Sequence, residues 1–427
     1  MNKRRIAAIA AAALMALNVG FQGVSSGLSP LRMNAVEASA TINMPQKIEA
    51  FVTRMYNVVL GRNPDATGLK NWTTKLTEHT ATASDIIYGF FCSDEYKGKK
   101  KSNEEIVTDC YNAMLDRDPD AAGKENWVKR LNVGMTTMAV CKGFVGSNEF
   151  KGLCSSYGID PGTISLSYAR DENYERTYFV YRLYANCLGR TPDITGLENW
   201  CKNLKNGTTG TQIAKGFIFS DEYKGKNVSN EEFVTMLYNT ILGRTPDSSG
   251  LSSWTNQLNI GKSREYVTNG FLFSSEFKGQ CSTAGITLGD KLHTIEDDDP
   301  YMAYACEVVA LVNEQRKANG LPELKVTSDL QSAAKKRAVE LYSSFSHTRP
   351  NGTSCFTVLN EYGILYSAAG ENIAAYYTSP SAVMNGWMNS AGHRENILTE
   401  GYEYIGVGVY KSGGSYFWVQ IFTAPRD

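Results

Sequence analysis

Two histidines and one glutamate in the C-terminal part of the chain are the residues best suited to chemistry. His347 lies in FSHTRPNG, Glu371 in GENIA and His393 in WMNSAGHRENIL, and the whole chain has only 4 histidines. Two neutral imidazoles that converge on one cavity are suitable ligands for Zn²⁺ or another divalent metal. Glu371 would orient one imidazole, join it as a ligand, or act as a general base on a metal-bound water.

Three interpretations of these residues stay open at the level of sequence. The first is a metal site with His347 and His393 as ligands. The second is a structural network in which His347 and Glu371 bond each other and His393 caps a helix end. The third is catalysis by the same residues, with Ser346 and Ser390 as nearby hydroxyls, but a Ser-His nucleophile needs a third orienting group that the sequence does not place. We therefore assign no catalytic residue, and whether the protein is an enzyme stays undecided.

The elements that must position these residues belong to one α+β domain, predicted at residues 301–427. YACEVVALVNEQRKANG predicts a helix closed by Gly320, and SDLQSAAKKRAVELYSSF predicts a second helix capped by Ser328 or Asp329. YIGVGVYK and SYFWVQIFTA alternate apolar and other residues around a Ser-Gly-Gly turn, which predicts a closing hairpin.

The motifs LVNEQRKANGLPEL, FSHTRPNG, GENIA, WMNSAGHRENIL and YIGVGVY occur in this order. Together they resemble the bacterial branch of the CAP superfamily (cysteine-rich secretory, antigen 5 and pathogenesis-related proteins). The resemblance implies an α-β-α sandwich whose central cavity is lined by two His and two Glu. Three of these positions are filled, by His347, Glu371 and His393. The second Glu would lie three residues after Trp387, where this chain has Ser390, and the missing carboxylate favours binding over catalysis.

Four copies of one segment precede this domain and identify a repeat. They are YNVVLGRNPDATGLKNW from Tyr56, YNAMLDRDPDAAGKENW from Tyr111, YANCLGRTPDITGLENW from Tyr184 and YNTILGRTPDSSGLSSW from Tyr238. Apolar spacing, Ser-x-x-Glu capping boxes and the helix-ending Gly-Arg-x-Pro-Asp predict three helices in each copy. The matching ends KGLCSSYGI and KGQCSTAGI group the copies into two paired all-α modules, residues 41–160 and 161–286.

The Gly-Arg-x-Pro-Asp-x-x-Gly-x-x-x-Trp core resembles domain-of-unknown-function family 4214, over about residues 48–290. The resemblance implies a role in surface attachment or glycan binding. Each Trp is interpreted as a core residue at helical spacing with Leu. Each Arg either pairs with a nearby acidic residue of its own repeat or grips a ligand carboxylate, and the internal pair is favoured. These residues are Trp72, Trp127, Trp200, Trp254, Arg62, Arg117, Arg190 and Arg244.

The chain has 9 cysteines, so at least one is free or paired between molecules. Cys92, Cys110 and Cys187 align with apolar residues of other copies, which indicates small core residues. A disulfide framework common to all repeats is therefore not expected. In the C-terminal domain, a bridge between Cys306 and Cys355 is a hypothesis.

The N-terminus predicts export. Residues 1–40 combine a basic start, a short apolar run and an Ala-Ser-Ala site, which is typical of a secretory signal peptide, with a retained anchor as the alternative. The formal net charge is −1, and removal of this segment makes it more negative because four basic residues and one acidic residue leave with it. This charge excludes a nucleic-acid partner, and no membrane span is expected after the signal.

The sequence therefore predicts a multidomain protein located outside the cell or on its surface. The helical repeats would attach to the surface or bind an envelope glycan, an acidic linker would follow at residues 287–300, and the CAP-like domain at 301–427 would bind a divalent metal and a small apolar or peptidic ligand. A metal-dependent hydrolase of peptide or cell-wall substrates is the alternative. A purely structural surface protein is the third possibility.

Overall fold

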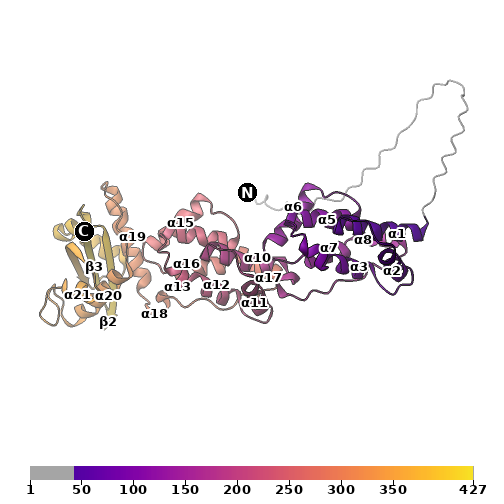
Figure 1. Ribbon diagram of the computed structural model, residues 1–427. Helices are drawn as coiled ribbons and strands as arrows, with labels where there is room; N and C mark the ends of the chain where they lie inside the picture. The colour runs from indigo at the N-terminus through magenta and orange to yellow at the C-terminus, as the bar shows by residue number, and fades with distance from the viewer. Residues whose placement is uncertain (1–42, 427) are drawn as a thin grey trace, which may run out of the picture. The chain divides into compact units, whose positions relative to one another are not determined.

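The computed structural model describes residues 43–426, with helices α1–α18 followed by a domain that holds the sheet and helices α19–α23 (Figure 1). The multidomain architecture expected from the sequence, helical repeats followed by an α+β domain, is confirmed. The signal peptide predicted at residues 1–40 lies outside the described residues. Within residues 43–426, no helix combines the length and apolar character needed to cross a bilayer.

The repeats are built from a common order of helical segments. The first has α1 (Met44–Arg54), η1 (Met55–Leu60), α2 (Ala66–Thr77), α3 (Ala83–Phe91) and α4 (Asp94–Gly98), and the second has α5 (Asn103–Cys110), η2 (Tyr111–Leu115), α6 (Ala121–Asn132), α7 (Thr137–Gly146) and α8 (Asn148–Tyr157). After α9 (Ala169–Glu172), the third has α10 (Tyr174–Arg182), η3 (Leu183–Leu188), α11 (Ile194–Lys205), α12 (Gly210–Ile218) and α13 (Asp221–Lys224). The fourth has α14 (Asn230–Leu237), η4 (Tyr238–Leu242), α15 (Ser248–Asn259), α16 (Arg264–Leu272) and α17 (Ser275–Ala284).

The helix expected to end each repeat is in fact two helices. Ser93 has an extended backbone (φ −61°, ψ 148°), and its hydroxyl accepts a hydrogen bond from the backbone N–H of Tyr96 at 3.1 Å. Such a residue starts a new helix, because its side chain satisfies an N–H that has no partner within the helix. The same serine cap begins α8, α13 and α17. The expected capping boxes at Ser102 and Ser229 are present.

The repeat motif is explained by contacts inside each copy. The first helix ends in a π-helical turn, and Asp65 then caps α2 by accepting from the N–H of Gly68 at 2.8 Å. A Cβ on Gly68 would lie 2.2 Å from the hydroxyl of Tyr56, so any larger residue would force the Tyr56 side chain to shift. The other three copies repeat this Tyr, Asp and Gly arrangement.

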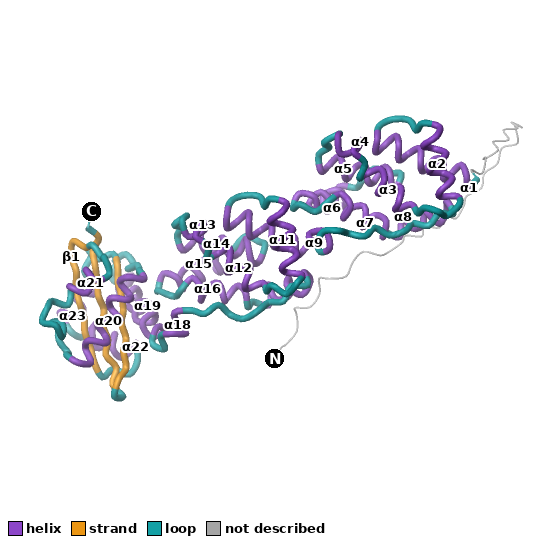
Figure 2. The backbone as a smooth tube through the Cα atoms, turned by 60° about the horizontal axis from the view of Figure 1, so that its bottom comes forward, coloured by secondary structure: helices purple, strands orange, loops and turns teal. Residues whose placement is uncertain are grey.

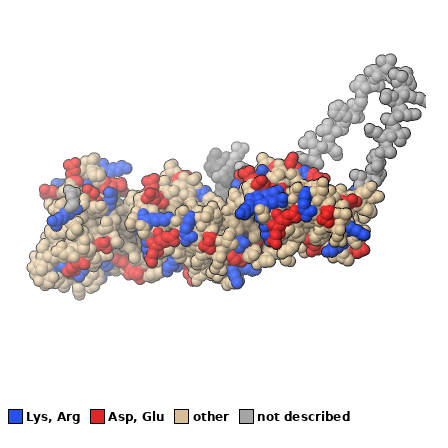
Figure 3. All heavy atoms as spheres, in the orientation of Figure 1, with Lys and Arg blue, Asp and Glu red and all other residues tan. Residues whose placement is uncertain are grey.

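The repeated Arg and Trp residues also have internal partners. Each Arg pairs with the Glu of the following Ser-x-Glu motif, at distances of 2.8, 2.6, 3.4 and 2.9 Å in the four copies, and lies over the ring of the repeat Tyr. Each Trp is partly buried against the core of its module. The preferred interpretation of both sets as structural residues is therefore confirmed. Figure 3 shows Lys and Arg interspersed with Asp and Glu on the visible face of the repeats.

Residues 287–300, predicted as a solvated acidic linker, have partners on the preceding module. The N–H groups of Gly210 and Thr211 donate to the carbonyls of Thr287 and Leu288 at 2.8 and 2.9 Å. Glu296 of the short helix α18 (Ile295–Asp298) accepts from the hydroxyl and N–H of Ser263, the cap of α16, at 2.6 and 2.7 Å. This segment thus closes the second module while it connects it to the next domain.

The C-terminal domain is an antiparallel sheet of strand order β1-β3-β2 between two layers of helices (Figure 2). Its elements are α19 (Met302–Ala318), α20 (Ser328–Ser343), α21 (Thr357–Glu361), β1 (Tyr366–Ala375), α22 (Pro380–Met388), α23 (Ala391–Leu398), β2 (Tyr404–Ser412) and β3 (Ser415–Pro425). The expected hairpin is β2 and β3. The expected cap of the second helix is wrong by one residue, since Thr327 is the cap of α20.

Side chains of alternate strand residues serve the two layers. Trp418 and Phe422 of β3 pack with α19, α22 and α23, whereas Val419 and Ile421 pack with α20 and α21. On β2, Gly408 faces α20 so closely that a Cβ would lie 2.0 Å from the carbonyl oxygen of Ala334. The glycines of YIGVGVY therefore allow α20 to lie directly on the sheet, which places its polar residues beside β1.

Candidate functional site

Glu371 is the buried centre of the site. It lies on β1 opposite Ile421 of β3 and shares a face of the sheet with Ile373, so its side chain is directed toward α20. The Nε of Arg337 on α20 donates to its Oε1 at 2.8 Å, and Nη2 donates to Oε2 at 3.4 Å. Both side chains are buried, with 0% of Arg337 and 1% of Glu371 exposed. This is a buried, hydrogen-bonded ion pair.

His347 is the exposed side of the same cluster. Its Nδ1 lies 2.8 Å from Oε2 of Glu371, and 57% of its side chain is exposed. A carboxylate at this distance favours the tautomer with the proton on Nδ1, which leaves Nε2 as an unprotonated lone-pair donor. The structure therefore brings His347 and Glu371 together, as the sequence predicts.

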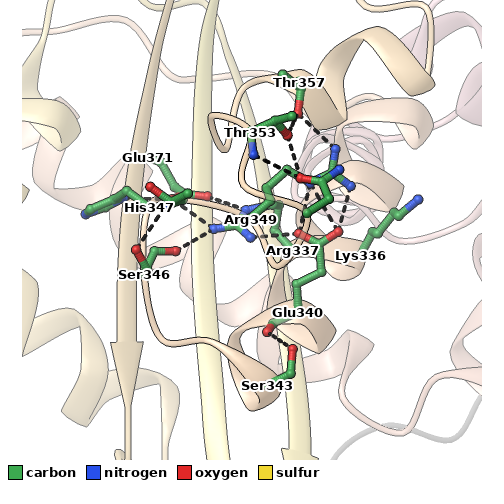
Figure 4. A network of polar contacts seen from close by, with 12 residues as sticks. Lys336, Arg337, Glu340, Ser343, Ser346, His347, Arg349, Thr353, Thr357 and Glu371 are labelled. Atoms are coloured by element: carbon green, nitrogen blue, oxygen red, sulfur yellow. Dashed lines mark hydrogen bonds and ion pairs between the residues drawn. The ribbon is translucent and has the colours of Figure 1, made fainter.

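A short, closed loop holds His347 in place. The carbonyl of His347 accepts from the N–H of Cys355 at 2.9 Å, and Thr348 forms a β-bridge with Ser354. Arg349 is buried, and its Nη2 contacts Glu340 at 2.6 Å (Figure 4). Its Nη1 contacts Glu361 at 2.7 Å. The loop is thus tied to both α20 and α21.

These charges shift one another's pKa values. Hydrogen bonds from Arg349 and Lys336 lower the pKa of Glu361 to about 2. Burial alone would raise the pKa of Glu340, but hydrogen bonds from Arg349 and Arg337 outweigh it and lower this pKa. Glu340 and Glu361 are therefore charged at neutral pH. Each of these carboxylates is neutralised by basic side chains of the protein, so neither needs a bound cation.

His393 reaches the site from α23 and is half-buried. Its pKa is lowered, first by burial and then by the charge of the His347 imidazole. The backbone carbonyl of His393 accepts from Nδ2 of buried Asn372 at 3.0 Å. Asn372 also bonds Gln420 of β3 at 2.9 Å, so the Asn of the GEN motif fixes α23 against the sheet.

The sequence suggested that His393 caps the helix that contains Trp387, but in the structure the neighbouring Arg394 does so. Nη1 of Arg394 donates to the carbonyl of Met388 at the end of α22, at 2.8 Å. Nor do the two serines form a catalytic pair with a histidine in the described residues. The hydroxyl of Ser346 accepts from the N–H of Thr348 at 3.0 Å, and Ser390 precedes α23 without a side-chain cap bond.

Cys355 joins the cluster, which the sequence did not predict. Its thiol, one nitrogen of His347 and one oxygen of Glu371 all lie within 4.8 Å of one another. The thiol is buried, and burial followed by the charge of Glu371 raises its pKa to about 11. The bridge hypothesised between Cys306 and Cys355 is not formed in the structure, where both are free thiols. Cys306 packs in the core layer of α19, whereas Cys355 lies beside Glu371 on the α20 side of the sheet.

Two sets of side chains could offer ligands to a metal near Glu371. One is Glu371 with Cys355, and the other is His347 with His393. Direct coordination by Glu371 and Cys355 would place the cation beside the buried guanidinium of Arg337, and Arg337 already bonds the carboxylate. A cation on the outer side, at Nε2 of His347 and the ring of His393, avoids this repulsion and uses Glu371 to orient an imidazole. The donors of this second arrangement are two imidazole nitrogens, which are a ligand type that divalent metals such as Zn²⁺ accept.

Sequence reasoning missed Arg337, Glu340 and Arg349. One signal was available for Arg337, which lies at helical spacing among the buried Leu330, Ala334 and other apolar residues of α20. An arginine on an apolar stripe requires a buried acidic partner.

Comparisons with known proteins agree with this structure. Residues 309–422 match the family CAP, described as the cysteine-rich secretory protein family. The four segments 36–100, 96–154, 165–227 and 214–281 each match DUF4214, a domain of unknown function. The chain is a CAP-domain protein with four DUF4214 repeats. Both family resemblances stated from the sequence motifs are thus confirmed.

Curated relatives match through the CAP domain. The uncharacterized protein YkwD of Bacillus subtilis (strain 168) is 38% identical over 122 residues, which cover 28% of this chain and 47% of the relative. The uncharacterized membrane protein YlbC of the same organism is 32% identical over 105 residues, which cover 24% of this chain and 30% of the relative. The chain thus spans less than half the length of either relative.

Solved structures also include similar domains. One is an extracellular protein containing an SCP domain from Bacillus anthracis str. Ames, with 32% identity, a TM-score of 0.26, and coverage of 28% of this chain and 39% of that one. Another is an outer surface protein from Borrelia burgdorferi, with 23% identity, a TM-score of 0.27, and coverage of 32% of this chain and 99% of that one.

Proposed function

We propose that the protein is a secreted or cell-surface binding protein. In this proposal its CAP domain binds a divalent metal such as Zn²⁺ at His347 and His393, together with a small apolar or peptidic ligand, and its repeats attach to the surface or recognise an envelope glycan. The observation that carries the metal site is the geometry of His347, whose Nδ1 contacts Glu371 at 2.8 Å while its side chain is 57% exposed. With the proton on Nδ1, Nε2 of His347 would bind the metal together with His393.

Binding is favoured over hydrolysis by the environment of Glu371. A general base must reach the water that it activates. Here the carboxylate is 1% exposed, and its two oxygens contact Arg337 and His347. The position where the CAP resemblance implies a second Glu is Ser390, so no other carboxylate of the motif replaces it. When bound, a metal would supply a Lewis-acidic centre for a ligand oxygen or nitrogen.

The location outside the cell rests on two features. Residues 1–40 have the pattern of a secretory signal peptide, and proteins that carry domains of this kind include ones named as extracellular or outer surface proteins. Sequencing the N-terminus of the mature protein tests this part. A first residue near 41 would support cleavage, whereas an intact N-terminus in the membrane fraction would indicate a retained anchor.

The repeat motif itself offers little to a glycan. Its Tyr, Arg, Asp and Gly residues have internal partners in each copy, so recognition would use exposed residues that differ between copies. Isothermal calorimetry of the full chain against envelope glycan fragments should give saturable heat. Absence of heat across a broad glycan panel would contradict this role while leaving the metal site untouched.

Zn²⁺ titration of variants that lack two of the four histidines tests the metal site. Zn²⁺ titration of the full chain should show one saturable site that is lost in the variant His347→Ala/His393→Ala. The matched control is His79→Ala/His293→Ala, which removes the two histidines outside the CAP site and should bind Zn²⁺ as the unmodified chain does. Equal Zn²⁺ binding by all three proteins would overturn the site.

A further inference from the structure

One pair of cysteines lies within reach of a covalent bond. The Sγ atoms of Cys110 and Cys141 are 4.0 Å apart, and both residues are completely buried between α5 and α7 of the second repeat. Residues 43–426 hold all nine cysteines, and no other pair among them has a sulfur-to-sulfur contact in the structure. Both are free thiols in the structure, and a bond between them needs the two sulfurs to approach to about 2.05 Å.

The other three repeats provide an internal comparison for this pair. The position of Cys110 precedes the repeat Tyr, and the position of Cys141 lies two residues before the Gly of the Gly-Phe pair. The equivalent residues are Met55 with Ile87, Leu183 with Ala214, and Leu237 with Thr268. All of them are buried. Three copies thus have neither cysteine, and the one copy that has a cysteine at either position has both.

The presence of both cysteines in one repeat, and of neither in the others, is what a disulfide between them requires. If each cysteine were only a small core residue, it would gain nothing from the presence of the other, because buried residues without a thiol fill both positions in the other copies. Chance would more often give a copy with a single cysteine. From the contact and its restriction to one copy, we infer that Cys110 and Cys141 form a disulfide that joins α5 to α7 in the exported protein.

The bond forms by exchange with a small-molecule or protein disulfide. The thiolate of one cysteine attacks this oxidant to give a mixed disulfide and releases one thiol. The second cysteine then displaces the remaining half as a second thiol, so that both protons leave on the released thiols. Burial raises the pKa of Cys141 well above its usual range, so exchange is expected before the second repeat has folded.

The test uses the full chain, refolded in a mixture of oxidised and reduced glutathione. Free thiols are blocked with N-ethylmaleimide, and the digested protein is mapped by mass spectrometry. We expect the peptides of Cys110 and Cys141 to be linked, with a mass about 2 Da below that of the two thiol peptides together. Blocking of both cysteines without reduction would overturn the inference. So would linkage of Cys141 to Cys92, the half-buried cysteine at the end of α3.

Two variants exploit the other repeats. Cys110→Leu/Cys141→Ala gives the second repeat the pair of the third, so it should fold, lack the linked peptide and lose sensitivity to reductant. In the unmodified chain, reductant should lower the melting temperature by roughly 5–10 °C. Adding Leu237→Cys/Thr268→Cys to this variant should create the same link between α14 and α16. Failure of this transplanted pair to link would contradict the geometric basis of the inference.

Discussion

At the scale of single residues, Glu371 has two partners, Arg337 at both carboxylate oxygens and His347 at one of them. Oε1 accepts from Arg337 at 2.8 Å, and Oε2 lies 2.8 Å from Nδ1 of His347. The carboxylate therefore neutralises a buried guanidinium and at the same time fixes the orientation of an exposed imidazole. Stability of the domain and geometry of the proposed site depend on the same side chain.

Replacement of this carboxylate by an amide should destabilise the CAP domain. In Glu371→Gln, Arg337 keeps Glu340 at 2.7 Å but loses its other charged partner. Loss of one partner of a buried ion pair usually costs about 3–5 kcal/mol, and the remaining pair should limit the effect to about 2–3 kcal/mol. Calorimetric unfolding of the full chain should show one transition at lower temperature.

Glu395→Gln is the matched control for this change. Glu395 lies on α23 and is exposed, so its variant should unfold within about 0.5 kcal/mol of the unmodified chain. Equal unfolding temperatures for Glu371→Gln and Glu395→Gln would show that the buried ion pair contributes no stability.

The sequence identified the site histidines and Glu371 but not what holds them. His347, Glu371 and His393 stand in motifs and are rare or buried residue types, so pattern alone locates them. Arg349 and Glu340 are charged residues of ordinary kind, and only the folded chain places them together at 2.6 Å. The proximity of Cys355 depends on the closed loop after His347, which no periodicity predicts.

At the scale of elements, the glycines of β2 set the distance between the sheet and α20. A Cβ on Gly408 would lie 2.0 Å from the carbonyl oxygen of Ala334, and backbone atoms cannot move aside as a flexible side chain can. Gly408→Ala should therefore destabilise the domain by about 3 kcal/mol or more, since overpacking forces backbone shifts. Thermal unfolding measured by calorimetry checks this value.

Gly401→Ala serves as the comparison for the strand glycine. No atom lies within 4 Å of the Cβ that this substitution would add, and its φ is not in the left-handed region. The variant should be neutral or slightly more stable. If both glycine variants unfold at the same temperature, the close approach of α20 does not limit the fold.

The loop that carries His347 should lose its anchoring in acid. The pKa of Glu361 is lowered to about 2, below its ordinary value of about 4.3, by Arg349 and Lys336. A depressed pKa means that this pairing stabilises the folded chain fully above pH of about 4.3 and is lost as the pH falls through about 2. The stability difference between the unmodified chain and Glu361→Gln should follow this course.

Unfolding in guanidinium chloride, at a series of pH values, measures this difference in stability. It should be constant from neutral pH down to about 5 and should shrink toward pH of about 2. A difference that does not change with pH would mean that the charge of Glu361 does not hold the loop.

At the scale of the whole molecule, the balance of charges disfavours a polyanionic partner such as a nucleic acid. The formal net charge is −1, and each repeat Arg is paired with a Glu of its own copy. Binding to a polyanion needs a surface with unpaired basic groups. We therefore expect the purified chain to pass a heparin column unretained at about 0.15 M salt. Elution only at about 0.5 M salt or above would contradict the exclusion of nucleic-acid partners.

The fold at this scale was largely predictable because the chain repeats itself. The four copies fixed the helical modules, and the motifs of the CAP domain fixed the sandwich. The division of the last helix by Ser93 and its equivalents was not predicted, because a serine is compatible with a helix until its backbone turns extended. The partners of residues 287–300 were missed because an acidic composition suggests solvent exposure.

The segments that close the two modules, residues 160–171 and 287–296, make equivalent hydrogen bonds. Ala83 and Ser84 donate to the carbonyls of Asp160 and Pro161, just as Gly210 and Thr211 donate to residues 287 and 288. Asp171 accepts from Thr136, the cap of α7, as Glu296 accepts from Ser263.

The same junction therefore leads from one module into the next module and into the CAP domain. A deletion of residues 161–287 would join Asp160 to Leu288 and leave a complete closing segment on the first module. Recombination within the gene at these matching segments could thus change the number of modules without creating a new junction.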